Sequence, residues 1–195
     1  MNTGLLSSLI DEIQQEYERL GHDRGWRFLT SAARTLSPKT EAVFVTLNPG
    51  GDHAPADHPS ESCEDGSPYV VETWSGHAPG RHKLQIQIRE LFKVLDLEFE
   101  TTLSGQLVPF RSPSWDSLPR REESLEFGKR IWTRVIRHVQ PSLVVAMGKS
   151  QLRAPLCEIL GTPVESREVP VHWGNITAGL DCFQNCVLLS LPHLS

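Results

Sequence analysis

Short apolar runs that stop abruptly at proline or glycine constrain the fold of this chain more than any other feature of its sequence. Continuous β-branched and aromatic residues, without helical periodicity, are typical of strands buried inside a parallel sheet. The runs are Val43–Thr46, Gln106–Phe110, Leu143–Met147 and Val187–Leu191. Because helical stretches separate them, we predict an α/β fold with a central, mostly parallel sheet sandwiched by helices.

Apolar residues recur at helical spacing in most of the intervening segments. Glycine or proline ends several of these segments, as is common at the carboxyl ends of helices. Ser124 is the expected N-cap of the strongest helix, which Pro141 follows. The predicted helices are 5–20, 26–36, 84–95, 124–139 and one that ends at Leu160, and shorter strands are predicted around 169–173 and 176–180.

Length and composition favour a single domain over residues 1–195, with a proper hydrophobic core. No apolar run approaches the roughly 20 residues of a membrane span, and the N-terminus lacks the pattern of a signal peptide. We therefore expect a cytoplasmic, monomeric protein without membrane contact. The net charge of −5 does not by itself indicate nucleic-acid binding, although clustered basic residues would still provide such a surface.

The four cysteines include no Cys-x-x-Cys pair, and we expect reduced, mostly buried thiols. An iron–sulfur or other metal site is the less favoured alternative. Four histidines lie in or beside the long loop of residues 50–82, but their spacing indicates no coordination geometry. We expect no metal and no cofactor.

Polar side chains follow three of the predicted strands, at Asn48, Arg111 and His193. Ligands of open α/β sheets bind beyond the carboxyl ends of the strands, so we expect these residues at the site. Asn48 precedes Pro-Gly-Gly, which permits a sharp turn and close approach of a ligand to the backbone. For His193 a functional role is favoured over a structural one, whereas Arg111 is equally suited to a phosphate contact or a surface ion pair.

The loop of residues 50–82 is rich in Gly, Pro, Ser, Asp and His and shows no periodicity. A loop this long in a compact domain is usually functional or mobile, and we predict that it forms one wall of a pocket. Within it, Tyr69, Glu72 and Trp74 have groups to offer a planar ligand. The alternative is that the two aromatic residues only pin the loop to the body of the protein.

Gly148-Lys149-Ser150 follows the predicted strand at 143–147 but does not complete a phosphate-binding loop, which requires a further glycine where Leu143 stands. A strand, a glycine turn and a helix start still suit a phosphate of a polymer backbone. We therefore assign Gly148 and Lys149 to backbone contacts.

The residues at the strand ends also carry a resemblance to a known family. Leu47-Asn48-Pro49-Gly50 resembles the first motif of the uracil-DNA glycosylase superfamily, in the Asn-Pro-Gly form of its mismatch-specific and single-strand-selective branches. Leu191-Pro192-His193-Leu194-Ser195 resembles the second motif, whose core is His-Pro-Ser. Gln106–Phe110 lies where the superfamily has a strand carrying the asparagine that reads the base. The three segments occur in the family's order and span the chain from about Trp26.

The resemblance implies a uracil-DNA glycosylase-like fold and a monofunctional enzyme that flips a nucleotide out of DNA and hydrolyses the bond between base and sugar. Its setting would be base-excision repair or defence against modified DNA. Asn48 would position the water, with Asp52 as a second candidate, and His193 would donate a hydrogen bond to the developing base anion. The implied base contacts are Leu47, Gln106, Tyr69 and Phe110, and the implied DNA-backbone contacts are Arg111, Gly148, Lys149 and Ser195.

The chain departs from the family pattern at three points. Gln106 stands in place of the usual asparagine, and Leu194 in place of the second proline. The family normally has an intercalating loop and a helix after the second motif, so either the chain is cut short after Ser195 or another element enters the duplex. Uracil is the family's default base, and a larger modified pyrimidine is the competitor that we favour, because the long loop implies a roomier pocket.

Two other functional classes remain open. One is a nucleic-acid-binding module that has kept the fold without the chemistry. The other is a small-molecule hydrolase that uses Asp52 with His53 or His193.

Overall fold

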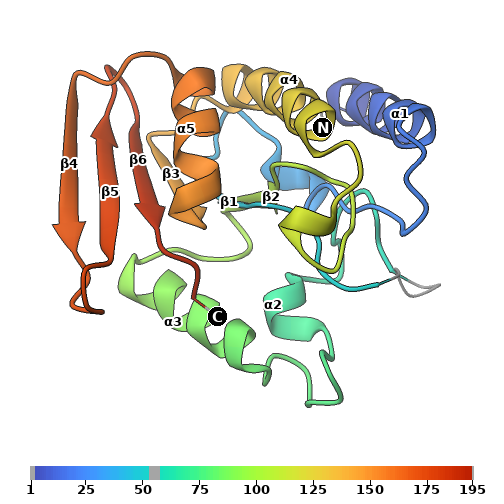
Figure 1. Cartoon of the computed structure of the whole chain (residues 1–195), viewed down its shortest axis with the longest axis horizontal. Helices are drawn as coiled ribbons and strands as arrows, with labels where there is room; N and C mark the ends of the chain where they lie inside the picture. The colour runs from blue at the N-terminus through green and yellow to red at the C-terminus, as the bar shows by residue number, and fades with distance from the viewer. Residues whose placement is uncertain (1–2, 53–57, 195) are drawn as a thin grey trace.

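The computed structural model describes residues 3–52 and 58–194 and consists of a six-stranded sheet with helices on both faces (Figure 1). The strand order is β2-β1-β3-β6-β5-β4. The strands β2, β1, β3 and β6 are parallel to their neighbours in this order. β5 pairs antiparallel with β6, and β4 pairs antiparallel with β5. The predicted α/β class is therefore confirmed, with a mixed sheet. The strands are β1 (Ala42–Thr46), β2 (Leu103–Gln106), β3 (Leu143–Met147), β4 (Glu165–Pro170), β5 (Thr177–Cys182) and β6 (Val187–Leu191).

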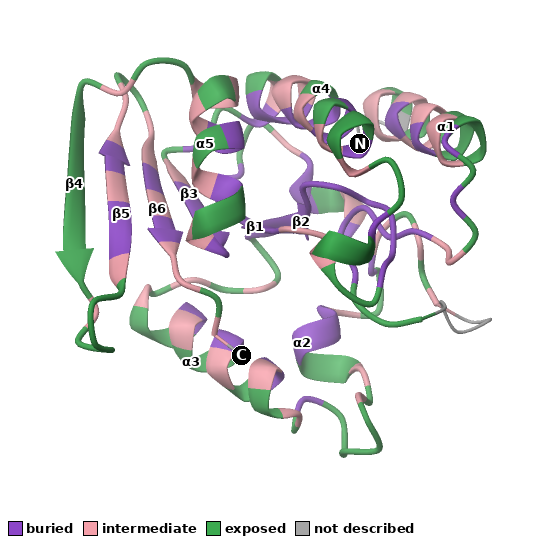
Figure 2. Ribbon diagram, in the orientation of Figure 1, coloured by how far each residue is buried: buried purple, intermediate pink, exposed green. Residues whose placement is uncertain are grey.

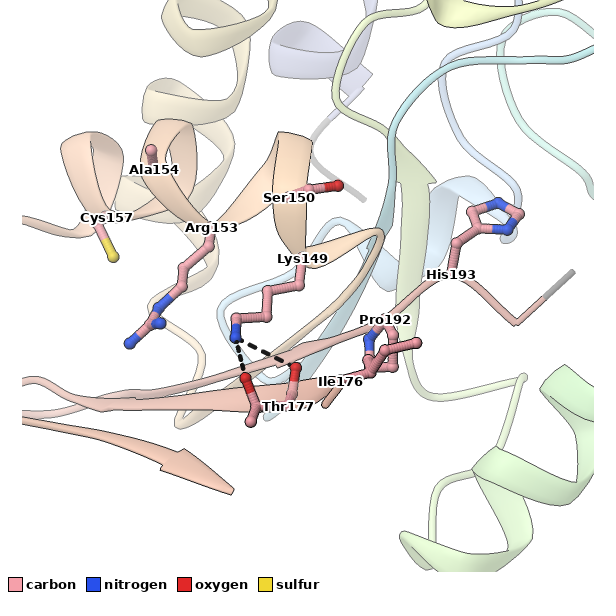
Figure 3. A pocket seen from close by; sticks show the side chains of 9 residues that line it. All are labelled: Lys149, Ser150, Arg153, Ala154, Cys157, Ile176, Thr177, Pro192 and His193. Atoms are coloured by element: carbon pink, nitrogen blue, oxygen red, sulfur yellow. Dashed lines mark hydrogen bonds between the residues drawn. The ribbon is translucent and has the colours of Figure 1, made fainter. Parts of the chain in front are cut away.

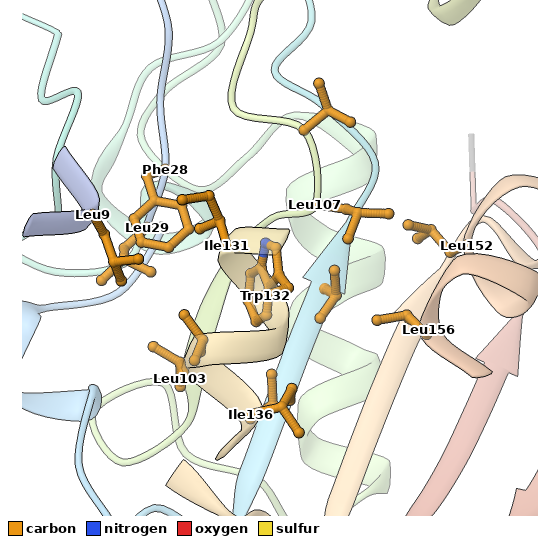
Figure 4. Packing of buried hydrophobic residues seen from close by; sticks show 14 of the residues in the cluster. Leu9, Phe28, Leu29, Leu103, Leu107, Ile131, Trp132, Ile136, Leu152 and Leu156 are labelled. Atoms are coloured by element: carbon orange, nitrogen blue, oxygen red, sulfur yellow. The ribbon is translucent and has the colours of Figure 1, made fainter. Parts of the chain in front are cut away.

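The two faces of the sheet have separate cores. On one face, valines of β1 and β3 pack with apolar residues of three helices around the fully buried Trp132 (Figure 4). On the other face, Phe44 and Val145 pack with Ile88 and Phe92. The helices of the first face are α1 (Thr3–Arg19), α4 (Arg121–Val139) and α5 (Lys149–Leu160), and those of the second are α2 (Pro68–Val71) and α3 (Lys83–Val94).

Burial explains the continuous apolar runs of the sequence. All five residues of β1 are buried, since helices cover both sides of this strand, whereas every residue of the edge strand β4 is exposed (Figure 2). A strand covered on both faces has no side for polar residues, so the absence of alternation correctly predicted β1, β3 and β6. None of the helices in the described residues is long and apolar enough to cross a membrane.

The predicted helix over 26–36 is wrong. Trp26 and Leu29 instead form isolated antiparallel bridges to the chain at and after β2, and only the 3-10 turn Ala33–Thr35 is helical. The backbone amides in this segment find partners elsewhere, as the N–H of Arg27 donates to the carbonyl of Pro109. The segment thereby lies along the edge of the sheet and satisfies hydrogen-bonding groups there, an arrangement that periodicity cannot reveal.

The second predicted strand has the wrong limits, because β2 ends at Gln106 where the prediction began. Gly105 explains the difference: a Cβ there would lie 2.8 Å from the carbonyl oxygen of Phe28, so this position of the strand needs glycine. The chain bends at Leu107 and Val108, and the N–H of Leu107 donates to the carbonyl of Thr46 at 2.8 Å. Gln106 is consequently placed at the carboxyl end of its strand.

Other boundaries shift by smaller amounts. The longest helix begins at Arg121 rather than after Ser124, whose buried hydroxyl lies 3.1 Å from His22 Nε2. The strands predicted around 169–173 and 176–180 are observed at 165–170 and 177–182. A second 3-10 turn covers Trp115–Ser117. All four cysteines are free, with Cys63 buried.

Candidate functional site

A cavity of about 1130 Å³ lies at the carboxyl ends of β1, β2 and β3. The long loop forms one wall, as predicted, through residues that include Tyr69, Glu72 and Trp74. The structure thus brings together residues that are far apart in the sequence. Of the residues singled out from the sequence as site residues, the cavity is lined by Leu47, Asn48, Tyr69, Gln106, Arg111 and His193.

The side-chain amide of Asn48 has a fixed orientation. Its Nδ2 donates to Ser112 Oγ at 2.8 Å and to the carbonyl oxygen of Phe110 at 3.2 Å. A carbonyl oxygen can only accept, so the nitrogen must face these partners and Oδ1 must face the other way. Among the described residues none donates to Oδ1. Asn48 therefore offers the cavity a rigid acceptor, suited to holding a water molecule.

Gln106 presents a second amide to the same cavity. Its Oε1 accepts a hydrogen bond from the hydroxyl of Thr46 at 2.7 Å, and both side chains are buried. The indole N–H of Trp132 donates to the backbone carbonyl of Gln106 at 2.7 Å, which fixes the end of the strand. In this arrangement Nε2 of Gln106 is a donor without a partner in the described part of the chain.

Tyr69 contributes a buried aromatic ring to the wall of the cavity. The side chain is buried, and its ring meets Phe44 and Trp74 in edge-to-face contacts with centroids 6.0 and 5.6 Å apart. Burial raises the pKa of Tyr69 to about 12, so its hydroxyl stays protonated at neutral pH. Tyr69 and Trp74 therefore do both things that the sequence left open: they pin the loop to the body and they line the cavity.

Arg27 and Glu72 form a neutral pair in the wall. Arg27 is buried, and its Nη2 donates to Glu72 Oε1 at 2.6 Å, while Trp74 Nε1 donates to Glu72 Oε2 at 2.8 Å. Glu72 is the one carboxylate among the described residues that line the cavity. Because its oxygens are already engaged, it is poorly placed to act as a strong general base. The sequence did offer a signal for Arg27, a charged residue between Trp26 and Phe28.

Arg111 lies beside this pair as a buried cation without a counter-ion. Only 8% of the residue is exposed, and no carboxylate in the described residues forms an ion pair with it. Its guanidinium donates to the carbonyl of Gly50, beneath the Asn48 turn, and to His58 Nε2 at 2.8 Å. Arg111 Nε is buried and unpartnered. Burial, and then the charge of Arg27, lower the pKa of Arg111.

His58 is neutral in this environment, since burial, Arg27 and Arg111 lower its pKa to about 4. The group of Arg27, Glu72, Arg111 and His58 therefore carries a net charge of +1, from two cations and one anion. A positive charge in a partly dry cavity favours an anionic ligand, because the attraction is screened less than in water.

His193 reaches the mouth of the cavity from the segment that follows β6. The residue is solvent-exposed, and the partial desolvation of its ring lowers its pKa, which favours the neutral imidazole. His193 also lines a second cavity of about 640 Å³ between α5, Pro192 and the start of β5 (Figure 3).

Two further candidates, Asp52 and Phe110, do not line the main cavity. Asp52 is largely exposed and pairs with Arg24 at 3.4 Å. Phe110 is fully buried and stacks on Phe127, so its side chain belongs to the core. His53 and Ser195 lie outside the described residues.

Lys149 and Gly148 also lie outside the main cavity. Lys149 lines the second cavity, where its ammonium donates to Glu168, to Thr177 Oγ1 at 2.7 Å and to the Thr177 carbonyl at 3.1 Å (Figure 3). Three acceptors occupy its three hydrogens, which leaves little for a phosphate. Gly148 has a φ of 118° and caps α5, and its N–H donates to the Leu191 carbonyl at 2.9 Å.

Together these groups can orient water, donate a hydrogen bond at the mouth, recognise a polar planar ligand and attract an anion. No group of three or more His, Cys, Asp or Glu side chains in the described residues is placed to hold a metal. No family model matches the chain, and no curated protein matches its sequence. The chemistry of the cavity is therefore the basis for any functional assignment.

Proposed function

We propose that the protein is a monofunctional DNA glycosylase that flips a pyrimidine nucleotide into the main cavity and hydrolyses its N-glycosidic bond. The observation that carries this proposal is the fixed amide of Asn48, whose oxygen accepts from none of the described residues, in the cavity that Gln106 and His193 also line. A target atom inside the stack cannot be reached without extrusion of the nucleotide, and a cavity of about 1130 Å³ has room for one.

The reaction suits a site in which the carboxylate of the described lining, Glu72, is already engaged by Arg27 and Trp74. As the bond between C1′ and the base nitrogen breaks, the base takes the bonding electrons and the sugar becomes an oxocarbenium ion. Water then adds its oxygen to C1′ and loses a proton, and the base gains one. The cation is electrophilic enough that water needs orientation more than deprotonation, which Asn48 Oδ1 supplies. The neutral imidazole of His193 donates a hydrogen bond that stabilises the base anion.

The charges of the wall support a nucleic-acid substrate over a small neutral one. The cluster of Arg27, Glu72, Arg111 and His58 is positive, and DNA carries a phosphate at every nucleotide. A small-molecule hydrolase based on Asp52 has less support, because Asp52 is exposed and paired with Arg24 away from the cavity. A non-catalytic DNA-binding module would use the same charges but would have no need for the fixed acceptor at Asn48.

A panel of oligonucleotides tests the proposal directly. Strands bearing uracil, hypoxanthine, hydroxymethylcytosine or glucosylated cytosine are incubated with the protein and then cleaved with alkali at abasic sites. Release of a base from at least one member supports a glycosylase. Binding to these strands without release from any of them would instead support the non-catalytic module.

Gln106→Asn tests which base the cavity accepts. The shorter amide moves the Nε2 donor away from the ligand and breaks the contact with Thr46. We expect a loss of about tenfold to a hundredfold in kcat/KM on a bulkier pyrimidine, with activity on uracil unchanged or raised, since a mispaired buried polar group costs on the order of 1–3 kcal/mol. Robust uracil excision by the unaltered protein, with nothing released from modified-cytosine DNA, would contradict the preference for a bulkier base.

Arg111→Met tests the buried cation. Methionine fills the space without charge, so the affinity for DNA should fall, and the dependence of log Kd on log salt should flatten by about one unit if the cation meets a phosphate. Arg137, exposed on α4, provides the control variant Arg137→Met. Thermal unfolding of both variants checks that the fold survives. An unchanged salt slope in Arg111→Met would show that the cation has only a structural role.

A further inference from the structure

The turn that joins β4 to β5, residues 171–176, lies at the end of the sheet where the parallel strands finish and where the main cavity lies. Because β5 runs antiparallel to β6, its first residue, Thr177, lies beside the end of β6, and the turn before it projects beyond that end (Figure 1). Gly179 pairs with Ser190, so continuing the register by two residues sets Thr177 opposite Pro192. The turn is thus next to the segment that carries His193.

The second cavity connects this hairpin to the proposed site. Ile176 and Thr177 line it from the hairpin, Pro192 and His193 line it from the segment after β6, and the remaining lining residues belong to α5 (Figure 3). His193 and Ser150 line both cavities, so the two are adjacent. If a flipped nucleotide occupies the main cavity and its DNA strand runs along this end of the sheet, the DNA would contact the hairpin.

The tip of the hairpin carries an exposed tryptophan. Trp173 is 52% exposed and Ile176 is 47% exposed, whereas the other four tryptophans are buried or half-buried. The turn is well defined, since the N–H of Val171 donates to the Ile176 carbonyl at 3.2 Å and the N–H of Ile176 donates to the Trp173 carbonyl at 3.3 Å. An aromatic ring held in solvent by a tight turn loses little conformational freedom on binding.

The hairpin tip is also free of opposing charge. No acidic residue occurs between Val169 and Leu180. The acidic residue that precedes the hairpin in the sequence, Glu168, is neutralised by Lys149 and Arg153. The residues of the hairpin tip therefore present no negative charge of their own to a polyanion.

We propose that residues 171–176 enter the DNA and that Trp173 stacks in the space that the flipped nucleotide leaves. This inference rests on the proposed function and names the element that keeps the duplex open. A flipped base leaves two unstacked neighbours, and an apolar or aromatic side chain between base steps offsets part of that cost. Base–aromatic stacking is tolerant of sequence, because every base has a π-face.

The proposal is tested with Trp173→Ala on matched duplex and single-stranded substrates. Each carries the base that the oligonucleotide panel identifies, or deoxyuridine if none is identified, with 2-aminopurine beside it. We expect kcat/KM on the duplex to fall by about tenfold to a hundredfold, with single-strand activity changed by less than about twofold. The 2-aminopurine fluorescence, which reports unstacking in the duplex, should also fall. Trp173→Phe should restore most of the duplex kcat/KM and most of the fluorescence. Val164→Ala, at the opposite end of β4 and 76% exposed, is the control and should change neither.

Equal losses on the duplex and the single strand, or no loss on either, would overturn the role of the hairpin. Failure to release any base would overturn the proposed function, but the 2-aminopurine measurement requires only binding and would still decide the hairpin's role. Loss of self-association in Trp173→Ala, without any change in DNA unstacking, would show that the tryptophan meets a second copy of the chain and would also overturn the proposal.

Discussion

Replacing Asn48 with alanine is expected to lower kcat/KM for base release by about two orders of magnitude or more while the fold survives. The loss follows from the orientation of the amide: Nδ2 is tied to Ser112 Oγ and to the Phe110 carbonyl, and this holds Oδ1 as a preorganised acceptor for water. Alanine removes the acceptor, so water must be captured from random orientations. Single-turnover kinetics on a saturating oligonucleotide measure the chemical step without product release.

Ser112→Ala supplies a graded control for Asn48. It removes the 2.8 Å anchor of the amide but keeps the acceptor itself, so we expect a smaller loss, on the order of tenfold. Because Ser112 is buried, thermal unfolding must accompany the kinetics. Near-normal turnover by Asn48→Ala would remove Asn48 from the mechanism, whatever the result for Ser112.

Replacing His193 with alanine is expected to cost about a hundredfold to a thousandfold, the usual effect of losing one donor to a developing anion. The loss should shrink with 5-fluorouracil, a better leaving group whose anion needs less stabilisation. His193→Gln keeps an N–H donor and should recover part of the rate. Because desolvation lowers the pKa of His193, its titration should not affect kcat/KM above about pH 7.

Two results would contradict this role for His193. An equal loss with uracil and with 5-fluorouracil would mean that the side chain does not act on the leaving group. A loss confined to KM, with kcat unchanged, would mean that it only binds the substrate.

The main sheet could be predicted from the sequence because strands covered on both faces consist of continuous apolar runs, as in Val43–Thr46 and Leu143–Met147. The same logic failed for β2, whose Ser104 and Gly105 are buried although neither is apolar. Gly105 is needed for close approach of the Phe28 backbone, which is a tertiary constraint. The false helix over 26–36 has a related cause, because its apolar residues serve an extended edge segment.

The site could be predicted in part for a topological reason. Asn48, Gln106 and His193 each stand at or just past the carboxyl end of a parallel strand, so the sheet itself brings them together. Arg111 was expected beyond a strand end, but its burial next to Arg27 and Glu72 depends on how the long loop folds back. Asp52, four residues after Asn48, points elsewhere, because the turn at Gly50 and Gly51 redirects the chain.

The position of β6 sets the order in which the domain can be completed. β6 follows all the other strands in the sequence but lies between β3 and β5 in the sheet. The β4–β5 pair consequently cannot join the parallel part of the sheet until residues 187–191 have paired with β3, because β5 pairs with β6. The docking of β6 thus places His193 at the cavity and fixes the position of the β4–β5 hairpin next to it. During synthesis, both would be acquired together once residues 187–193 have been translated, so a chain interrupted before them would hold neither.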